Sequence, residues 1–326
     1  MMKLSTMKTI VDTVDEEWNS SFGEKIAGLW DYDEGTVKYF RSSANFIFIF
    51  RREGEDYYLR FNRSDEREKD SIEEEIRLLN YLNDVTSNIV KPIKSINNKY
   101  IESVKTDLGE YYAVVFKGLK GKQYEIEDID TEQYYIWGKA LGNLHKLINT
   151  IPKDMTIKRN SWKDHLNFIE DNLSEEEILA KRELEEVKRW VDSLEITDNN
   201  YGLIHFDFEL DNLRWEDNVI SILDFDDCSY YWYVADIAFA LRDLFEDSID
   251  LTNSDFQEFI KGYESEFKID KELLNDLSWF MRFHNLLSYT KLLRSIDILD
   301  YTDIPSWLLG LKKKLRRVVN NYRNSF

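Results

Sequence analysis

In the first third of the chain, hydrophobic residues gather in short runs separated by charged and polar stretches. Two β-prone runs, FIFIF and YYLRF, lie between residues 45 and 61, and the RREGED between them suits a hairpin turn. Further short strands are expected near 89–96, 99–103 and 110–116. The stretch 71–82 (SIEEEIRLLNYL) places apolar residues on one helical face and acidic residues in its first half. This pattern predicts an antiparallel sheet accompanied by an amphipathic helix.

The rest of the chain is dominated by helical periodicity. It predicts helices over about 131–148, 174–194, 255–266 and 271–299. Only residues 203–225 differ, because short apolar stretches there alternate with carboxylates, and two brief strands, 213–215 and 219–223, are expected to flank a turn. A sheet-rich first part followed by a helix-rich second part predicts an α+β fold. We place the boundary between two lobes at residue 117, giving segments 1–117 and 118–326.

Composition narrows the class of protein. The chain has 326 residues, one cysteine (Cys228), a formal net charge of -20 and no apolar run long enough for a signal peptide or a membrane span. The single cysteine excludes an internal disulfide framework and fits a reducing compartment, so we expect a cytoplasmic protein. The negative charge argues against nucleic-acid or anionic-membrane partners and permits a cationic ligand. The basic cluster 312–317 alternates with Leu and Val and is expected to be the exposed face of a terminal helix.

One motif carries the chemistry. His205, Asp207 and Asn212 have the spacing H-x-D-x-x-x-x-N, and Asp224 follows in ILDFDD after the second predicted strand. Phosphoryl transfer needs a carboxylate that orients the attacking hydroxyl and accepts its proton, together with oxygen ligands for Mg²⁺. Asp207 is therefore the expected catalytic base, and Asn212 and Asp224 are the expected metal ligands.

This segment resembles the aminoglycoside phosphotransferase and choline kinase family, whose signatures are H-G-D-x-x-x-x-N and [IV]-D-[FW]-[DE]. The Asp236-Ile-Ala segment, LGNLHKL from residue 141 and the EEIRLLNYL helix extend the resemblance over about residues 40 to 245. It implies a bilobal protein-kinase-like fold, in which an antiparallel-sheet N-terminal lobe binds nucleotide and a mostly helical C-terminal lobe binds the acceptor. It also implies that Asp236 braces the catalytic loop, and we expect His205 to do the same.

The resemblance also assigns the nucleotide-binding residues. Arg60 stands where the family has a phosphate-binding lysine, and Glu75 matches the acid that pairs with it. Ser43 and Asn45 belong to a loop that would cap the triphosphate, although the expected glycines are lacking. From their position in the chain alone, Phe116 and Gly118 are expected to lie against the nucleotide base.

Two departures from the family pattern bear on activity. Arg60 keeps the positive charge of the lysine but has a different reach. Phe206 replaces the glycine between His205 and Asp207 and so removes a flexible backbone position.

The sequence says least about which residues bind the phosphate acceptor. Candidate acceptor-binding residues are Glu209, Asp211, Asp227, Tyr231 and Trp232. With the acidic residues Asp243, Glu246 and Asp247, the aromatic run 230–233 either forms an acidic, aromatic-lined pocket for a cation or packs in the core.

The sequence thus predicts a kinase that transfers phosphate from ATP or GTP, with Mg²⁺, to a hydroxyl of a small molecule such as an aminoglycoside, an amino alcohol, homoserine or a sugar. Two alternatives stay open. One is a Ser/Thr protein kinase, and the other is a nucleotide-binding module with weakened catalysis.

Overall fold

The computed structural model describes residues 1–245, 249–299 and 304–326. The chain forms two compact units, each built from separate segments of sequence. Unit 1 consists of residues 1–76, 91–118 and 288–326, and unit 2 consists of residues 77–90 and 119–287. The second predicted segment, 118–326, is therefore divided between the two units. The assignment of nucleotide binding to residues 1–117 and acceptor binding to 118–326 stays a prediction.

The helices are α1 (Leu4–Val11), α2 (Ser21–Ala27), α3 (Lys69–Val85), α4 (Thr131–Ile148), α5 (Trp162–Asn172), α6 (Ile178–Val191), α7 (Tyr233–Ala240), α8 (Ser254–Glu264), α9 (Leu277–Ser295) and α10 (Ser306–Ser325). The strands are β1 (Lys38–Ser42), β2 (Phe46–Arg52), β3 (Glu55–Arg63), β4 (Pro92–Ile93), β5 (Glu102–Thr106), β6 (Gly109–Lys117), β7 (Tyr201–Ile204), β8 (Leu213–Glu216), β9 (Val219–Ile222) and β10 (Ser229–Trp232).

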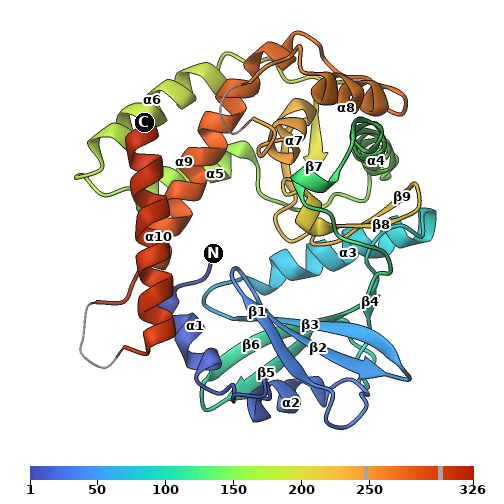
Figure 1. Cartoon of the computed structure of the whole chain (residues 1–326), viewed down its shortest axis with the longest axis vertical. Helices are drawn as coiled ribbons and strands as arrows, with labels where there is room; N and C mark the ends of the chain where they lie inside the picture. The colour runs from blue at the N-terminus through green and yellow to red at the C-terminus, as the bar shows by residue number, and fades with distance from the viewer. Residues whose placement is uncertain (246–248, 300–303) are drawn as a thin grey trace. The chain divides into compact units, whose positions relative to one another are not determined.

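Unit 1 is organised around an antiparallel sheet with strand order β1-β2-β3-β6-β4, in which β5 also pairs with β6 (Figure 1). The predicted hairpin is β2–β3. Arg52 pairs with Glu55, so the turn consists of Glu53 and Gly54, with φ of 53° and 79°. Two consecutive residues with positive φ define the type I′ turn that matches strand twist. The glycine in RREGED is thus placed where the turn requires it.

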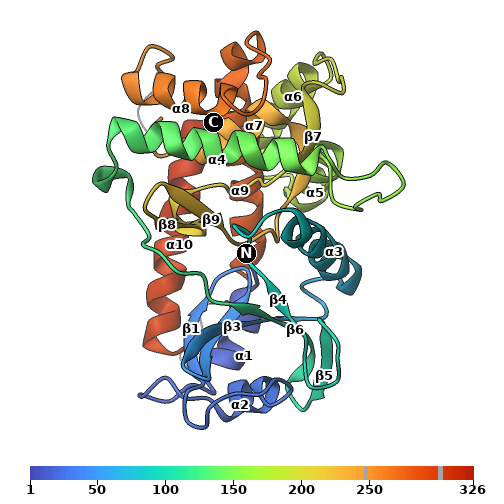
Figure 2. The same ribbon diagram turned by 90° about the vertical axis from the view of Figure 1, so that its right-hand side faces the viewer.

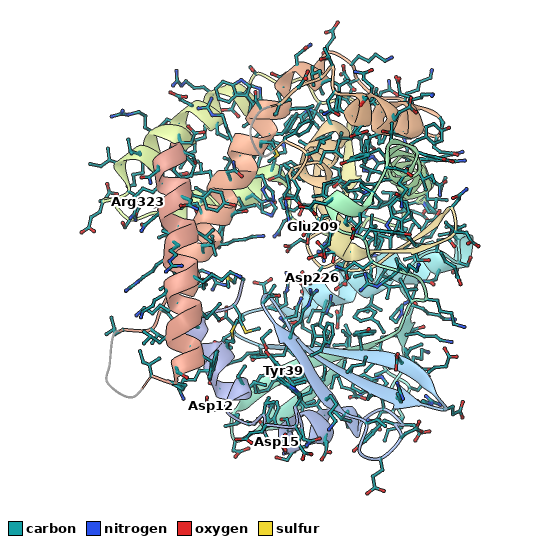
Figure 3. All side chains as sticks on the ribbon, in the orientation of Figure 1. Asp12, Asp15, Tyr39, Glu209, Asp226 and Arg323 are labelled. Atoms are coloured by element: carbon teal, nitrogen blue, oxygen red, sulfur yellow. The ribbon has the colours of Figure 1, made fainter. Side chains whose placement is uncertain are left out.

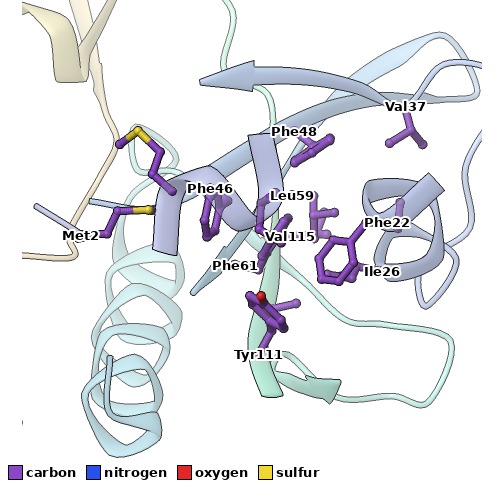
Figure 4. Packing of buried hydrophobic residues seen from close by; sticks show 14 of the residues in the cluster. Met2, Phe22, Ile26, Val37, Phe46, Phe48, Leu59, Phe61, Tyr111 and Val115 are labelled. Atoms are coloured by element: carbon purple, nitrogen blue, oxygen red, sulfur yellow. The ribbon is translucent and has the colours of Figure 1, made fainter. Parts of the chain in front are cut away.

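The core of unit 1 lies on one face of this sheet. Alternate residues of β2, Phe46, Phe48 and Phe50, are at most 1% exposed, as the period of two along a strand requires. Phe61 of β3 stacks on Phe46 and Phe48 at centroid distances of 5.2 and 5.6 Å. Figure 4 shows this aromatic layer with Phe22 of α2 against it. Helices α1 and α10 contribute further side chains to the same cluster.

Several elements of unit 1 differ from expectation. The sequence pattern did not predict α1, α2 or β1, and the strand expected over 89–96 is reduced to β4. The basic cluster on α10 is only partly exposed. Lys312 is 1% exposed and its Nζ donates a hydrogen bond to the backbone oxygen of Ile298, so its assignment to the exposed face was wrong. Its aliphatic stem lies on the apolar side of the helix and only its charged end needs a partner.

Unit 2 is mainly helical and its largest packing interface joins α4 and α8 (Figure 2). The two helices approach closely at glycines. A Cβ on Gly138 would lie 1.9 Å from the backbone oxygen of Phe259, and a Cβ on Gly262 would lie 1.9 Å from that of Tyr135. The expected helix 131–148 is confirmed, and a capping box of Asp130 and Gln133 begins it.

Two small antiparallel ladders shape the part of unit 2 that carries the motif. Strands β8 and β9 form the predicted short hairpin, and β7 pairs with β10. Strand β10 then runs directly into α7. Helix α5 was not predicted, and the long helix expected over 271–299 is a short 3₁₀ turn followed by α9. Of the helices within the described ranges, none is long and apolar enough to cross a membrane.

Candidate active site

The loop between β7 and β8 carries the H-x-D-x-x-x-x-N motif, and a buried carboxylate holds its first part. Asp236, on α7, is 0% exposed. Its Oδ2 accepts a hydrogen bond from the backbone N–H of His205 and its Oδ1 accepts one from that of Phe206, each at 2.8 Å. Charge-assisted bonds of this kind contribute about 1.5–3 kcal/mol each. The path of the chain immediately before Asp207 is therefore fixed by α7.

Asp236 is itself held by two further helices. His145 of α4 lies with its Nε2 3.0 Å from Asp236 Oδ2, and its Nδ1 is 2.7 Å from the hydroxyl of Tyr263 on α8. Burial raises the pKa of Tyr263 well above its ordinary value, so the phenol stays neutral. This buried chain connects the catalytic loop to the α4–α8 interface. Sequence reasoning did not predict this contact, although the LGNLHKL segment that contains His145 carries part of the family resemblance.

Phe206 occupies a backbone conformation that favours glycine. Its φ is 75°, in the left-handed region, which costs a residue with a side chain about 1–2 kcal/mol. The ring is 3% exposed and packs against His165, Tyr231 and Phe239 at centroid distances of 5.2, 5.4 and 4.9 Å. The loop thus keeps the backbone conformation that a glycine would adopt freely, and a buried aromatic cluster offsets its cost.

His205 links the catalytic loop to the segment before Asp224. Its Nε2 lies 3.1 Å from the backbone oxygen of Leu223, and the backbone N–H of Asp207 points to its Nδ1 at 3.3 Å. These partners require the proton on Nε2 and a lone pair on Nδ1. Burial lowers the pKa of His205, which agrees with a neutral ring.

Asp207 and Asn212 are joined directly. Asn212 Nδ2 donates hydrogen bonds to Asp207 Oδ2 and to the backbone oxygen of Asp207, both at 2.9 Å. The amide nitrogen is thereby fully engaged, and Asn212 Oδ1 makes no hydrogen bond to another described residue. The Asp207 side chain is 33% exposed, and its second oxygen, Oδ1, lies 3.6 Å from Nη1 of Arg242. The Nη2 of Arg242 forms an ion pair with Glu209. Sequence reasoning did not find Arg242.

Asp224 lies two residues beyond the end of β9, has a φ of 63° and is half-buried. The backbone after it is held by Arg159, another residue that the sequence did not single out. Arg159 donates to the backbone oxygens of Cys228 at 2.8 Å, Phe225 at 3.4 Å and Asp226. Figure 3 labels Asp226 of this loop and Glu209 of the catalytic loop. One guanidinium therefore holds three of the four carbonyl groups that follow the expected metal ligand.

The donor set fits Mg²⁺. Asn212 Oδ1 and the carboxylate of Asp224 are hard oxygen ligands, and Mg²⁺ in nucleotide sites is bound by one or two carboxylates together with phosphate oxygens and water. Within the described residues, no cluster of three or more His, Cys, Asp or Glu side chains is arranged to hold a metal alone.

The expected acceptor-binding residues do not share one environment. Tyr231 and Trp232 are 1% and 0% exposed, and their polar atoms bond to His165 and to the backbone oxygen of Glu195. They lie in the core, which corrects their placement in an open pocket and favours the packing alternative.

The expected acidic residues lie closer to solvent. Glu209 is paired with Arg242, Asp211 is exposed and accepts a hydrogen bond from Gln123 at 2.7 Å, and Asp227 is half-buried. Asp243 is exposed, whereas Glu246 and Asp247 lie outside the described residues.

In unit 1 the expected ion pair is present. Nη1 of Arg60 lies 2.9 Å from Oε1 of Glu75, and Nη2 pairs with Oε2, so the contact is bidentate. Arg60 is 4% exposed and Glu75 is 1% exposed. The guanidinium also lies 5.0 Å from the ring centroid of Phe116. Arg60, Glu75 and Phe116 thus form one buried group.

The other expected nucleotide-binding residues lie at the ends of strands of the sheet. Ser43 and Asn45 lie in the β1–β2 loop, where Asn62 donates to the backbone oxygen of Ala44 at 3.1 Å. Ser43 is exposed, whereas Asn45 is 5% exposed. Gly118 follows β6 and its N–H donates to the backbone oxygen of Asp56 at 2.8 Å. A Cβ at Gly118 would lie 2.8 Å from that same oxygen, so the close approach requires glycine.

Unit 2 also has a hollow of about 460 Å³, lined by α4, the β8–β9 hairpin and the segment after α3. Its lining includes Tyr135, Lys139 and Asn143 of α4 and Asn218 of the hairpin. None of the candidate site residues of the motif is among the lining residues.

Comparison with known proteins agrees with the geometry of the loop. Residues 36–269 match the model of the phosphotransferase enzyme family, which is most of the chain. The chain belongs to this family and is a phosphotransferase of the small-molecule kinase type.

Individual relatives are more distant. Amicoumacin kinase of Bacillus subtilis (strain 168) is 23% identical over 282 residues, which cover 83% of this chain and 84% of the relative. Among solved structures, an amicoumacin kinase in complex with AMP-PNP, Ca²⁺ and Ami has a TM-score of 0.77 at 22% identity, covering 98% of this chain and 96% of the other. A microcompartment-associated aminopropanol kinase has a TM-score of 0.71 at 18% identity, with 93% and 95% covered. A spectinomycin phosphotransferase has a TM-score of 0.60 at 14% identity, with 92% and 96% covered. These structural similarities establish the shared bilobal α+β fold of the protein-kinase type.

Proposed function

We propose that the protein transfers the terminal phosphoryl group of ATP or GTP, with Mg²⁺, to a hydroxyl group of a small amine-bearing molecule. The observation that carries the proposal is the state of Asp207. Its Oδ2 is bonded to Asn212, whereas its Oδ1 belongs to a side chain that is one-third exposed. An acceptor hydroxyl can therefore reach a carboxylate oxygen whose position is already fixed, which is what phosphoryl transfer asks of the protein.

Each residue then has a defined task. Asp207 accepts a hydrogen bond from the acceptor hydroxyl and takes its proton as the new P–O bond forms. The bond between the terminal phosphorus and the bridging oxygen breaks, and the nucleoside diphosphate leaves with that oxygen. Asn212 Oδ1 and Asp224 hold Mg²⁺, which neutralises phosphate charge when bound. His205 and Asp236 keep the loop in place through their bonds to its backbone. In unit 1, Arg60 and the 43–45 loop bind the phosphates, Glu75 orients Arg60, and Phe116 and Gly118 bind the base.

The proposed acceptor class rests on the relatives and on charge. The names of the similar proteins refer to amicoumacin, aminopropanol and spectinomycin as substrates. Aminopropanol is an amino alcohol, and the net charge of -20, with exposed Asp211 near the catalytic loop, favours a cationic acceptor. Aminoglycosides, homoserine and sugars complete the set to be tested.

The two alternatives gain less support. In the described stretch from Asp224 to Asp236, β10 continues directly into α7 and leaves no room for the activation segment of a protein kinase. A module without catalysis would not need the bond between Asp207 and Asn212, which the structure retains.

The experiment is Mg²⁺-dependent nucleotide consumption by the purified protein with each acceptor and with a generic protein acceptor. Asp207→Asn should lower kcat by about 10³-fold, because positioned general bases contribute about 10²–10⁴. Nucleotide affinity should stay within about twofold. The matched control is Asp217→Asn, the same change at an exposed turn. Unchanged turnover in Asp207→Asn would show that Asp207 is not the base. Tight nucleotide binding without turnover on any acceptor would favour the binding module.

A further inference from the structure

Arg242 is the cation nearest to the expected reaction centre among the described contacts of unit 2. It follows α7, and its side chain is 29% exposed, close to the 33% of Asp207 and the 18% of Glu209. Its Nη2 forms an ion pair with Glu209, and its Nη1 lies 3.6 Å from Asp207 Oδ1. The three charged groups are thus partly open to a ligand, unlike the buried Asp236.

The two oxygens of Asp207 are not equivalent, and this fixes where a ligand must bind. Oδ2 accepts a hydrogen bond from Asn212, so an acceptor hydroxyl has Oδ1 as its partner. A hydroxyl on Oδ1 places its oxygen about 2.7 Å away, and a phosphorus atom in line for attack lies about 3–3.5 Å further. Arg242 faces the same oxygen. The reacting group therefore lies within reach of its guanidinium.

The guanidinium has donors left for that group. Arginine carries five N–H donors in a planar fork. The 3.6 Å contact to Asp207 is an ion pair that is too long for a hydrogen bond. Within the described residues, the guanidinium of Arg242 makes no hydrogen bond except that to Glu209. Glu209 therefore holds one side of the fork and leaves the Nη1 side available.

The positive charge of Arg242 reduces the electrostatic repulsion between the site and a bound nucleotide. Without Arg242, two carboxylates, Asp207 and Glu209, would face the negatively charged phosphates of the incoming nucleotide. An arginine here offsets one of them and can bind phosphoryl oxygens in bidentate fashion. Its effect increases as charge develops on the transferred group, because a preorganised cation costs no reorganisation at that moment.

We propose that Arg242 binds the phosphoryl group during its transfer to the acceptor hydroxyl, and that Glu209 acts as a positioning residue that holds Arg242 in place. Glu209 is then not an acceptor-binding residue. The inference rests on the proposed function, since it takes Asp207 as the base. The competing interpretation is that Arg242 only neutralises Glu209 and supports the loop.

The test compares Arg242→Ala and Arg242→Lys with Arg182→Ala, the matched loss of an exposed arginine on α6. In Arg242→Ala we expect kcat to fall by about 10²–10³-fold, as for loss of one preorganised donor, with ADP affinity and melting temperature close to those of the wild type. Arg242→Lys should retain an intermediate rate, because it keeps the charge without the fork. Millimolar guanidinium should partly restore Arg242→Ala and leave Asp207→Asn unchanged.

Two results would overturn the inference. One is a kcat of Arg242→Ala within about threefold of the wild type. The other is a loss of rate that matches a fall in melting temperature and does not respond to guanidinium, which would make Arg242 structural.

A binding measurement separates this inference from the proposed function. ADP with aluminium fluoride mimics the phosphoryl group in transfer, and its affinity can be measured without turnover. A loss of tenfold or more in Arg242→Ala, with ADP alone unaffected, supports the role of Arg242 even if no tested acceptor is phosphorylated. Equal affinities overturn it. Loss of turnover in Asp207→Asn together with a normal Arg242→Ala would leave the proposed function intact and remove only the role of Arg242.

Discussion

In unit 1 the charged side chains expected to bind the nucleotide are buried. In unit 2 the expected catalytic side chain is partly exposed, and the buried side chains are those that hold its loop in place. Arg60 and Glu75 are 4% and 1% exposed and satisfy each other. In unit 2 the reactive carboxylate, Asp207, is 33% exposed, and the fully buried charge belongs to Asp236 on another helix.

This difference in burial affects how available each charged side chain is to a ligand. Arg60 must share its guanidinium between Glu75 and any phosphate, so its availability to phosphate depends in part on how Glu75 holds it. Asp207 keeps one carboxylate oxygen for the acceptor. Hydrogen bonds from or to Asp236, His205 and Asn212 hold its loop and its other oxygen in place. Because the reactive carboxylate and the residues that position it are different groups, Asp207 can stay hydrated while the buried residues around its loop stay rigid.

The largest effect is expected at the support of unit 2. Asp236→Asn would place an amide N–H₂ opposite one of the two backbone donors and remove the buried charge. We expect the free energy of unfolding to fall by about 3 kcal/mol and kcat to fall by at least about 100-fold. Denaturant unfolding and steady-state kinetics measure the two quantities. Asp198→Asn, at an exposed position, is the control. A variant that keeps both values would contradict the role of Asp236 as the support of the loop.

The buried pair of unit 1 should give the next effect. Glu75→Gln removes the negative charge that Glu75 places beside the buried guanidinium of Arg60, and we expect the free energy of unfolding to fall by about 2–3 kcal/mol. Replacing both residues, as Arg60→Met with Glu75→Leu, should recover most of the stability while nucleotide affinity is lost.

The control for this pair is Glu73→Gln, which breaks an exposed pair with Lys69 at 2.7 Å and should cost about 0.5 kcal/mol or less. If the double variant bound nucleotide normally, Arg60 would be a structural residue only.

A smaller effect on stability should distinguish the contribution of the Phe206 backbone conformation from that of its side chain. Phe206→Ala and Phe206→Gly both remove the buried ring, but only glycine adopts a φ of 75° without strain. We therefore expect Phe206→Gly to be more stable than Phe206→Ala by about 1 kcal/mol. Thermal unfolding of the two variants under one set of conditions measures this difference. An alanine variant of equal or greater stability would mean that the loop relaxes to another conformation when the ring is lost.

The smallest effect is a pH dependence from His205. Burial lowers its pKa from the ordinary 6.5, so the unfolded chain binds a proton at a pH where the folded protein does not. The unfolded state is thus favoured as the pH falls below about 6.5, and the stability from the neutral ring is present above that value. Denaturant unfolding between pH 5 and 8 should show a steeper acid loss in the wild type than in His205→Gln, which bonds without titrating. Identical pH profiles would exclude this contribution.

The sequence pattern was sufficient to predict those elements whose structure is determined by residues close together in the chain. The apolar, β-prone runs of β2 and β3 and the glycine of the turn between them specify the hairpin, and the helical period of 3.6 with a capping box specifies α4. The motif spacing likewise brought Asp207 and Asn212 together, because five residues of a tight loop allow few paths. The Arg60–Glu75 pair required the family resemblance, since three consecutive acids near a helix start have another explanation.

The remaining features depend on contacts that are distant in sequence. Arg242 and Arg159 stand in no motif, and each reaches its partners only through the packing of α7 or the segment before α5. Tyr231 and Trp232 were misplaced because β10 is buried on both sides, so its aromatic run has no alternation to read. Helices α1 and α2 are short and gain their stability from the unit 1 core rather than from propensity.

The division of unit 1 into three segments has a consequence for the order in which the protein is made. Its core includes Leu4 and Met7 of α1 and also Leu308 and Leu315 of α10. Unit 2 ends at Leu287, so all of its residues are synthesised before α10. At about 5–20 residues per second, the sheet of unit 1 waits on the order of ten seconds or more, after β6 is made, for the helix that completes its core. The sheet of unit 1 is therefore translated before most of unit 2 but can complete its core only after unit 2 has been synthesised.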